Sequence, residues 1–135
     1  MSKRLDENLG SVDYDGLIVA NEPVADVFSV EIRKETSEAA VLKRGTVLAL
    51  SGGTGGDGTM VILGTTATGN ETLIANCILA EDVEVGTSAN VTALAYRTGH
   101  FARNKLIVKV STNMSAADEE NLRNAGILLS DAIDY

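Results

Sequence analysis

A regular alternation of apolar and polar side chains begins at residue 26 and constrains the fold more than any other feature of the sequence. Phe28, Val30 and Ile32 fall on one side of an extended chain, and Val27, Ser29, Glu31 and Arg33 fall on the other. A period of two residues is that of a β-strand with one buried face. We therefore expect a strand here, packed on an apolar core.

Five more short apolar stretches follow, each bounded by a turn of Gly or polar residues. They lie at residues 46–50, 59–63, 73–80, 91–96 and 105–110. The stretch at 73–80 is nearly continuous in apolar residues, which favours a central strand. Strands of this length, with turn signals at this spacing, are typical of a small barrel or a sandwich-like β domain.

Two connections between these stretches have a distinctive composition. Residues 51–58 contain five glycines in eight positions, which predicts a flexible hairpin tip. Residues 98–104 form a polar segment that includes the single histidine, His100, for which a loop or edge position is expected.

One short helix is expected near the C-terminal end. Ser115 can cap it, and Asp118 three residues later completes a pair of the capping-box type. Residues 116–125 are good helix formers, Gly126 is a fitting stop, and residues 127–129 return to the core. The predicted fold class is mainly β with a minor α+β component: a compact small β-barrel with one helix.

Residues 1–25 are predicted to form a flexible N-terminal arm, and residues 26–135 the β-rich domain. The arm is polar apart from one apolar patch, Leu17, Ile18, Val19 and Ala20. Pro23, which precedes Val24, bars a helix at this point. The patch either packs on its own domain or binds a partner, and the sequence leaves both options open.

The composition excludes several classes of function. The formal net charge is −8 and only 4% of the residues are aromatic. Nucleic acids and anionic membranes are bound by clustered Lys and Arg, and single strands also by stacked aromatic rings. The N-terminus lacks the apolar stretch of a signal peptide, and no run is long enough for a membrane helix. We expect synthesis in a cytoplasm, without direct nucleic-acid or membrane binding.

Four features could carry chemistry, and each has a simpler explanation. Residues 53–58 match the G-x-G-x-x-G pattern of dinucleotide sites, but a strand rather than a helix is expected next. His100 alone cannot make a histidine-rich metal site, and Cys77 lies in the most apolar stretch, where burial is expected. The acidic cluster of Glu81, Asp82 and Glu84 does not have the spacing of a calcium loop. We expect no enzyme, no cofactor and no metal.

Four segments together resemble the lambda-type head decoration proteins of bacteriophages. The first is Asn21-Glu22-Pro23 followed by the alternating strand and residues 42–48. The others are residues 78–83, residues 91–104 with their strand, Gly, aromatic, Asn order, and residues 120–127, which resemble the family's closing helix and its Gly-Ile ending. The likeness runs from about residue 21 to 129, in the family's order. The sequence departs from the pattern in a longer, more acidic arm and in residues 52–58, which look like an insertion.

The resemblance implies a function that composition does not show. Members of the family form homotrimers on the outside of an expanded head, have a compact fold sometimes called a β-tulip, and order their arms against the major capsid protein. It implies a virion protein that stabilises the head, with itself and the major capsid protein as partners. The expected capsid-binding residues are Leu17, Ile18, Val19, Ala20, Pro23 and Val24.

We expect the arm to add to a sheet of the capsid protein as a strand, with Pro23 ending that strand. The alternatives are another virion β module, such as the base of a head fibre, and a glycan-binding adhesion domain. The glycan-binding function predicts an aromatic groove, for which two Phe and three Tyr give little material.

Overall fold

The computed structural model describes residues 16–20, 23–110 and 112–130. Within these ranges the chain forms nine strands, a short 3-10 helix and an α-helix. In chain order they are β1 (Ile18–Ala20), β2 (Asp26–Ile32), β3 (Ala40–Leu42), β4 (Val47–Gly52), β5 (Met60–Ile62), β6 (Thr72–Leu79), β7 (Val83–Val85), β8 (Val91–Ala102), η1 (Arg103–Lys105), α2 (Ala116–Ala125) and β9 (Ile127–Ser130).

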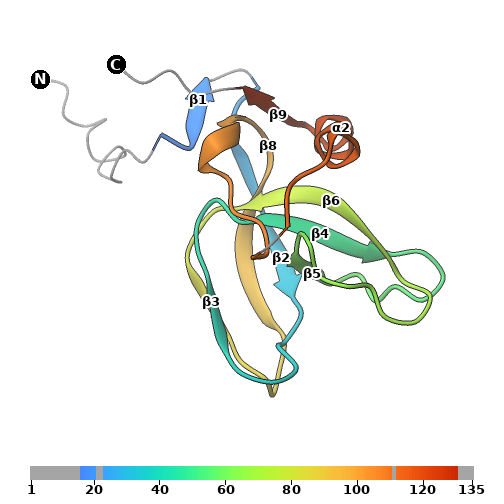
Figure 1. The fold of residues 1–135 in the computed structure, drawn as a ribbon. Coiled ribbons are helices and arrows are strands. Elements are labelled where there is room, and N and C mark those ends of the chain that lie inside the picture. Colours follow the sequence, from blue (N-terminus) through green and yellow to red (C-terminus); the bar gives the residue numbers. More distant parts are fainter. Residues whose placement is uncertain (1–15, 21–22, 111, 131–135) are drawn as a thin grey trace, which may run out of the picture.

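Five strands, β2, β5, β4, β6 and β8, close into a small barrel, so the predicted mainly β fold class is confirmed (Figure 1). β2 pairs with β8 along its whole length, and antiparallel pairing also joins β4 to β5 and β6. The ring is completed by one parallel contact, Ile32 with Met60, and by a short ladder between β6 and β8. β3 and β7 pair as a separate two-stranded ribbon.

The alternating stretch forms β2 as predicted. Val30 and Ile32 are buried inside the barrel, while Val27, Ser29 and Glu31 point outward and are exposed. The core inside the barrel is otherwise aliphatic and sulfur-containing, with Leu48, Met60, Cys77 and Leu79 among its members. The period of two residues was a reliable signal here because only one face of this strand is covered.

The central strands β4 and β6 are covered on both faces. Leu48 and Cys77 face the barrel interior, whereas Val47 and Ile78 belong to a second core outside the barrel. Leu122 of α2 completes this outer core and is fully buried. This second layer explains why the stretch 73–80 is almost continuously apolar.

β8 leaves the barrel at its C-terminal end and becomes the middle strand of a small sheet with β1 and β9 (Figure 1). The prediction that residues 98–104 form a polar loop was wrong for residues 98–102, which continue β8. His100 therefore lies in a strand, paired with Ala20 on one side and Leu128 on the other. The two added strands satisfy the backbone of this otherwise polar segment.

The predicted helix is present as α2, with the predicted capping box. The Ser115 hydroxyl accepts from the Asp118 N–H at 3.1 Å, and the Asp118 carboxylate accepts from the Ser115 N–H at 3.0 Å. Gly126 ends the helix with a φ of 114°, in the left-handed region. A Cβ at this position would lie 2.9 Å from the Arg97 carbonyl oxygen, so both the turn and the packing require glycine.

The prediction of a strand at residues 105–110 was wrong. The segment begins in η1 and forms only an isolated bridge, between Thr46 and Ile107. The Ile107 N–H donates to the Gly45 carbonyl and the Ile107 carbonyl accepts from Val47, just before β5 begins to pair with β4 at Leu48. Because β5 and β6 occupy both edges of β4 beyond that point, the segment cannot continue as a strand of the barrel.

Candidate functional site

The predicted capsid-binding residues lie in two places, β1 and the connection to β2. Leu17, just before β1, is only 2% exposed and packs in the outer core with Val47, Phe101 and Ile127. Its carbonyl also accepts a hydrogen bond from the Ala102 N–H at 2.7 Å. The Leu17 side chain therefore belongs to the core of its own domain, which was one of the two options left open for the apolar patch.

β1 itself is a three-residue strand held against β8. Ile18 pairs with Phe101 and Ala20 with His100, with a register irregularity between them. Ile18 is partly buried against the outer core, whereas Val19 is 36% exposed. Among the residues that the structure describes, β1 pairs with β8 and with no other strand.

Pro23 and Val24 precede β2 and present a different surface. Val24 is 70% exposed, and its carbonyl accepts from the Thr98 hydroxyl at 2.7 Å. The backbone is therefore fixed here while the apolar side chain remains uncovered. The rest of the predicted arm, residues 1–15, 21 and 22, lies outside the described residues.

The Gly-rich residues 52–58 join β4 to β5, which pair as the predicted hairpin. The strand expected after the G-x-G-x-x-G pattern is confirmed as β5. The loop is fixed by backbone hydrogen bonds, among them Gly58 N–H to the Ser51 carbonyl at 2.9 Å and Gly55 N–H to the Asn70 carbonyl at 3.3 Å. At Gly56 a Cβ would lie 2.4 Å from the Gly52 carbonyl oxygen, so the glycines allow the chain to fold closely onto itself.

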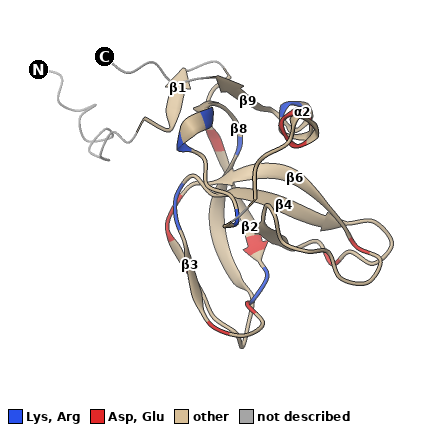
Figure 2. Cartoon of the chain, viewed as in Figure 1, with Lys and Arg blue, Asp and Glu red and all other residues tan. Residues whose placement is uncertain are grey.

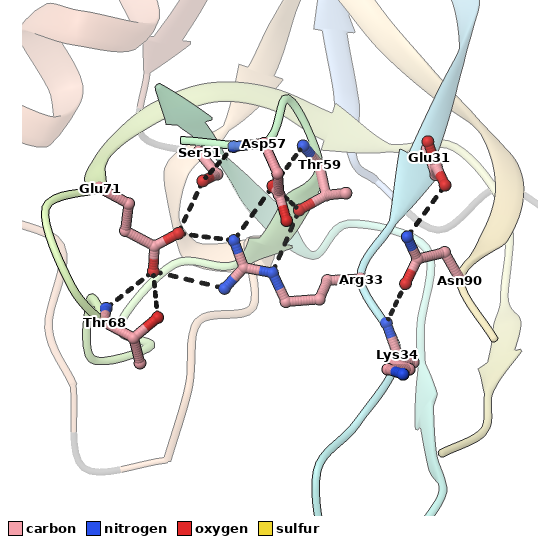
Figure 3. Close-up of polar contacts among 9 residues, drawn as sticks. All are labelled: Glu31, Arg33, Lys34, Ser51, Asp57, Thr59, Thr68, Glu71 and Asn90. Atoms are coloured by element: carbon pink, nitrogen blue, oxygen red, sulfur yellow. Dashed lines mark hydrogen bonds and ion pairs between the residues drawn. The ribbon is translucent and has the colours of Figure 1, made fainter. Parts of the chain in front are cut away.

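A polar network that no sequence pattern predicted holds this tip to the barrel (Figure 3). Arg33, at the end of β2, donates from Nη2 to Glu71 Oε1 at 2.6 Å and from Nη1 to Oε2 at 3.3 Å. The same guanidinium donates to Asp57 at 3.3 Å and, through Nε, to the Thr59 hydroxyl at 3.1 Å. The Ser51 hydroxyl donates to Glu71 Oε1 at 2.6 Å.

Glu71 is the centre of this network, and its side chain is only 3% exposed. The Arg33 guanidinium, the Ser51 hydroxyl and the Thr68 N–H together lower the pKa of Glu71 to about 2. Two hydrogen bonds from Thr59, with a smaller contribution from Arg33, lower the pKa of Asp57 to about 2. A buried carboxylate with this many hydrogen-bond donors stabilises the fold, because its charge is already satisfied by those donors.

The other candidate residues also have structural surroundings. Cys77 is fully buried, as predicted, and burial raises the pKa of its thiol to about 12. The Asp82 carboxylate accepts from the Arg44 N–H at 2.7 Å, and Glu81 accepts from the Leu94 N–H at 3.0 Å. In the part of the chain that the structure describes, no three His, Cys, Asp or Glu side chains are grouped so that they could hold a metal ion.

Positively and negatively charged residues occur in several parts of the described chain, α2 among them (Figure 2). Several are paired across strands or elements, such as Arg97 with Asp26 at 2.9 Å and Arg103 with Glu119 at 3.0 Å. No helix in the described ranges is long and apolar enough to cross a membrane.

Two comparisons with known proteins address the family to which the chain belongs. A family model described as bacteriophage lambda head decoration protein D matches residues 15–127. The matched region extends from just before β1 to the first residue of β9, and so includes the whole barrel. No curated protein sequence matches the chain.

Proposed function

The chain belongs to the bacteriophage lambda head decoration protein D family, and we propose on that premise that it binds the outer surface of an expanded phage head as a trimer. The family match over residues 15–127, most of the chain, supports this proposal. The family is one of structural capsid proteins, and the proposed partners are the major capsid protein and two further copies of this chain.

We propose that the segment before β2 makes the contact with the major capsid protein by strand addition. Within the described residues β1 pairs along one edge only, with β8, and strand edges bind extended peptides through main-chain hydrogen bonds. Leu17 anchors the segment in the outer core, while Val19 and Val24 offer exposed apolar side chains beside it. Ile18, Ala20 and Pro23 set the position of the strand and its end.

Trimerisation makes such a contact effective. β1 is only three residues long, so strand addition by one copy makes few main-chain hydrogen bonds and one copy alone binds weakly. Three arms on one trimer act together, and linking binding sites raises the overall affinity by roughly 10²–10⁴ without new contacts. Bound trimers then hold neighbouring capsid subunits together.

The test is binding of purified protein to expanded heads that lack decoration protein. We expect the double variant Val19→Asp with Val24→Asp to keep nearly the unfolding temperature of the full chain, because both side chains are exposed, but to bind heads at least tenfold more weakly. Its mass by light scattering should stay that of a trimer, since the barrel is intact. Undiminished binding of this variant would refute the arm mechanism, and a monomer for the full chain would refute the trimer.

The glycan-binding alternative receives no support from the described aromatic residues. Phe101 is fully buried, and Tyr96 is partly buried and packs beside it with the ring centroids 5.3 Å apart. Phe28 is also partly buried, against the barrel core. Sugar-binding sites commonly present an open aromatic face, and none of these three rings is classed as exposed.

A further inference from the structure

A groove of about 500 Å³ lies between α2 and β9. One wall is a single face of α2, since Ala116, Glu119, Glu120 and Arg123 are three or four residues apart. The other wall is β9, with His100 and Arg103 beside it. Neither the barrel fold nor the proposed arm contact uses this groove.

β9 lines one wall of the groove and pairs with β8 along one edge. β9 is parallel to β8, and the Gly99 N–H donates to the Gly126 carbonyl at the start of the ladder. In a parallel ladder alternate residues bond to the same neighbour, so Leu128 bonds to β8 while Ile127 and Leu129 point their N–H and C=O groups away from it. Within the described residues, β9 pairs with β8 and with no other strand. These backbone groups form an edge that a further strand can pair with.

The charges around the groove are already paired. Arg103 holds Glu119 through two hydrogen bonds of 3.0 and 3.2 Å, and Arg123 holds Glu120. Two positive and two negative side chains therefore cancel, which gives a phosphate or a carboxylate no advantage in the groove. Among the described residues, the outer main-chain edge of β9 pairs with no strand, and an extended polypeptide is the ligand that fits such an edge.

We propose that this groove takes an extended segment of the major capsid protein, which adds to β9 as the fourth strand of the β1–β8–β9 sheet. The inference rests on the proposed function. It names this partner because β1, the root of the proposed arm, lies on the opposite edge of β8 in the same three-stranded sheet. Figure 1 shows β1, β9 and α2 at one end of the molecule, away from β3, so a partner bound at β1 is at the same end as the groove.

Two neighbouring alanines provide a matched test. Ala116 and Ala117 are both exposed residues in the first turn of α2, but only Ala116 lines the groove. We expect Ala116→Trp to fill the groove and weaken binding to expanded, undecorated heads at least tenfold, and Ala117→Trp to bind within twofold of the unmodified chain. If Ala116→Trp binds heads as tightly as the unmodified chain, or if Ala117→Trp loses as much affinity as Ala116→Trp, the proposed role of the groove is refuted. Failure of the unmodified chain to bind heads would instead refute the proposed function.

The occupant can be identified by cross-linking on decorated heads. Because Cys77 is buried with a raised pKa, a thiol introduced by Ser130→Cys at the end of the groove is the accessible one in the described chain. It can carry a short photoreactive group, with Ala117→Cys as the control. A cross-link from position 130 to the major capsid protein, with a weaker one from position 117, supports the proposal. A cross-link to another copy of this chain, or none from position 130, overturns it.

Discussion

Leu17→Ala tests whether the apolar patch belongs to the domain or to a free arm. Leu17 is 2% exposed in the outer core, and the substitution removes three carbon atoms. At about 0.8 kcal/mol for each buried CH₂, the transfer term alone is about 2.4 kcal/mol. The remaining cavity usually raises the cost of Leu→Ala to about 3–5 kcal/mol, but β1 is held by only two residue pairs and can detach locally. We therefore expect a loss of about 2–3 kcal/mol in the free energy of unfolding.

The measurement is urea unfolding followed by circular dichroism, with the slope of the transition as a check that the compactness of the states is unchanged. A loss of this size should lower the melting temperature by roughly 6–12 °C for a domain of this length. Val19→Ala is the control, because Val19 is 36% exposed, and it should cost less than about 1 kcal/mol. If Leu17→Ala unfolds at the same urea concentration as the unmodified chain, the packing of Leu17 in the core is refuted.

Three further substitutions test the network, the helix cap and the helix end. Because the pKa of Glu71 falls from 4.5 to about 2 on folding, its contribution is present above pH 4.5 and is lost as the pH falls toward 2. Glu71→Gln should therefore lower the melting temperature at pH 7 and flatten its dependence on pH between 5 and 2 in an acid titration; an unchanged pH profile would contradict this. Ser115→Ala should cost about 1 kcal/mol in urea unfolding through loss of the cap, and no change would show that the cap contributes nothing. Gly126→Ala should cost more than about 1 kcal/mol, whereas Gly86→Ala, with open space around its Cβ, should be nearly neutral; equal effects would contradict the close packing at Gly126.

Local patterns in the sequence were sufficient for some elements. β2 could be predicted because one of its faces lies inside the barrel and the other is exposed, which produces a period of two residues. α2 could be predicted because the signals for its start and end, Ser115, Asp118 and Gly126, are adjacent in sequence. These features depend on near neighbours, so they are visible without knowledge of the tertiary structure.

The features that were missed depend on distant partners. Residues 98–102 continue β8 because β1 and β9 come from the two ends of the described chain to pair with them. Arg33 and Glu71 are 38 residues apart, and no local pattern marks either as a partner of the other. The apolar run at 105–110 has the composition of a strand, but β4 has no free edge beyond its start. Of the proposed capsid-binding residues, the sequence could identify the apolar patch but not that Leu17 is inside the core.

β8 belongs to both the barrel and the small sheet, and this sharing decides how the domain responds to a force on its N-terminal end. A pull on the chain at Gly16 first meets Leu17 and the β1 pairing, and then passes along the backbone into β2. β2 is paired with β8 from Asp26 to Ile32, so the tension ends on a long antiparallel ladder whose hydrogen bonds share it. We therefore expect a chain pulled at Gly16 to lose the pairing of its short strand β1 first and to keep the barrel intact.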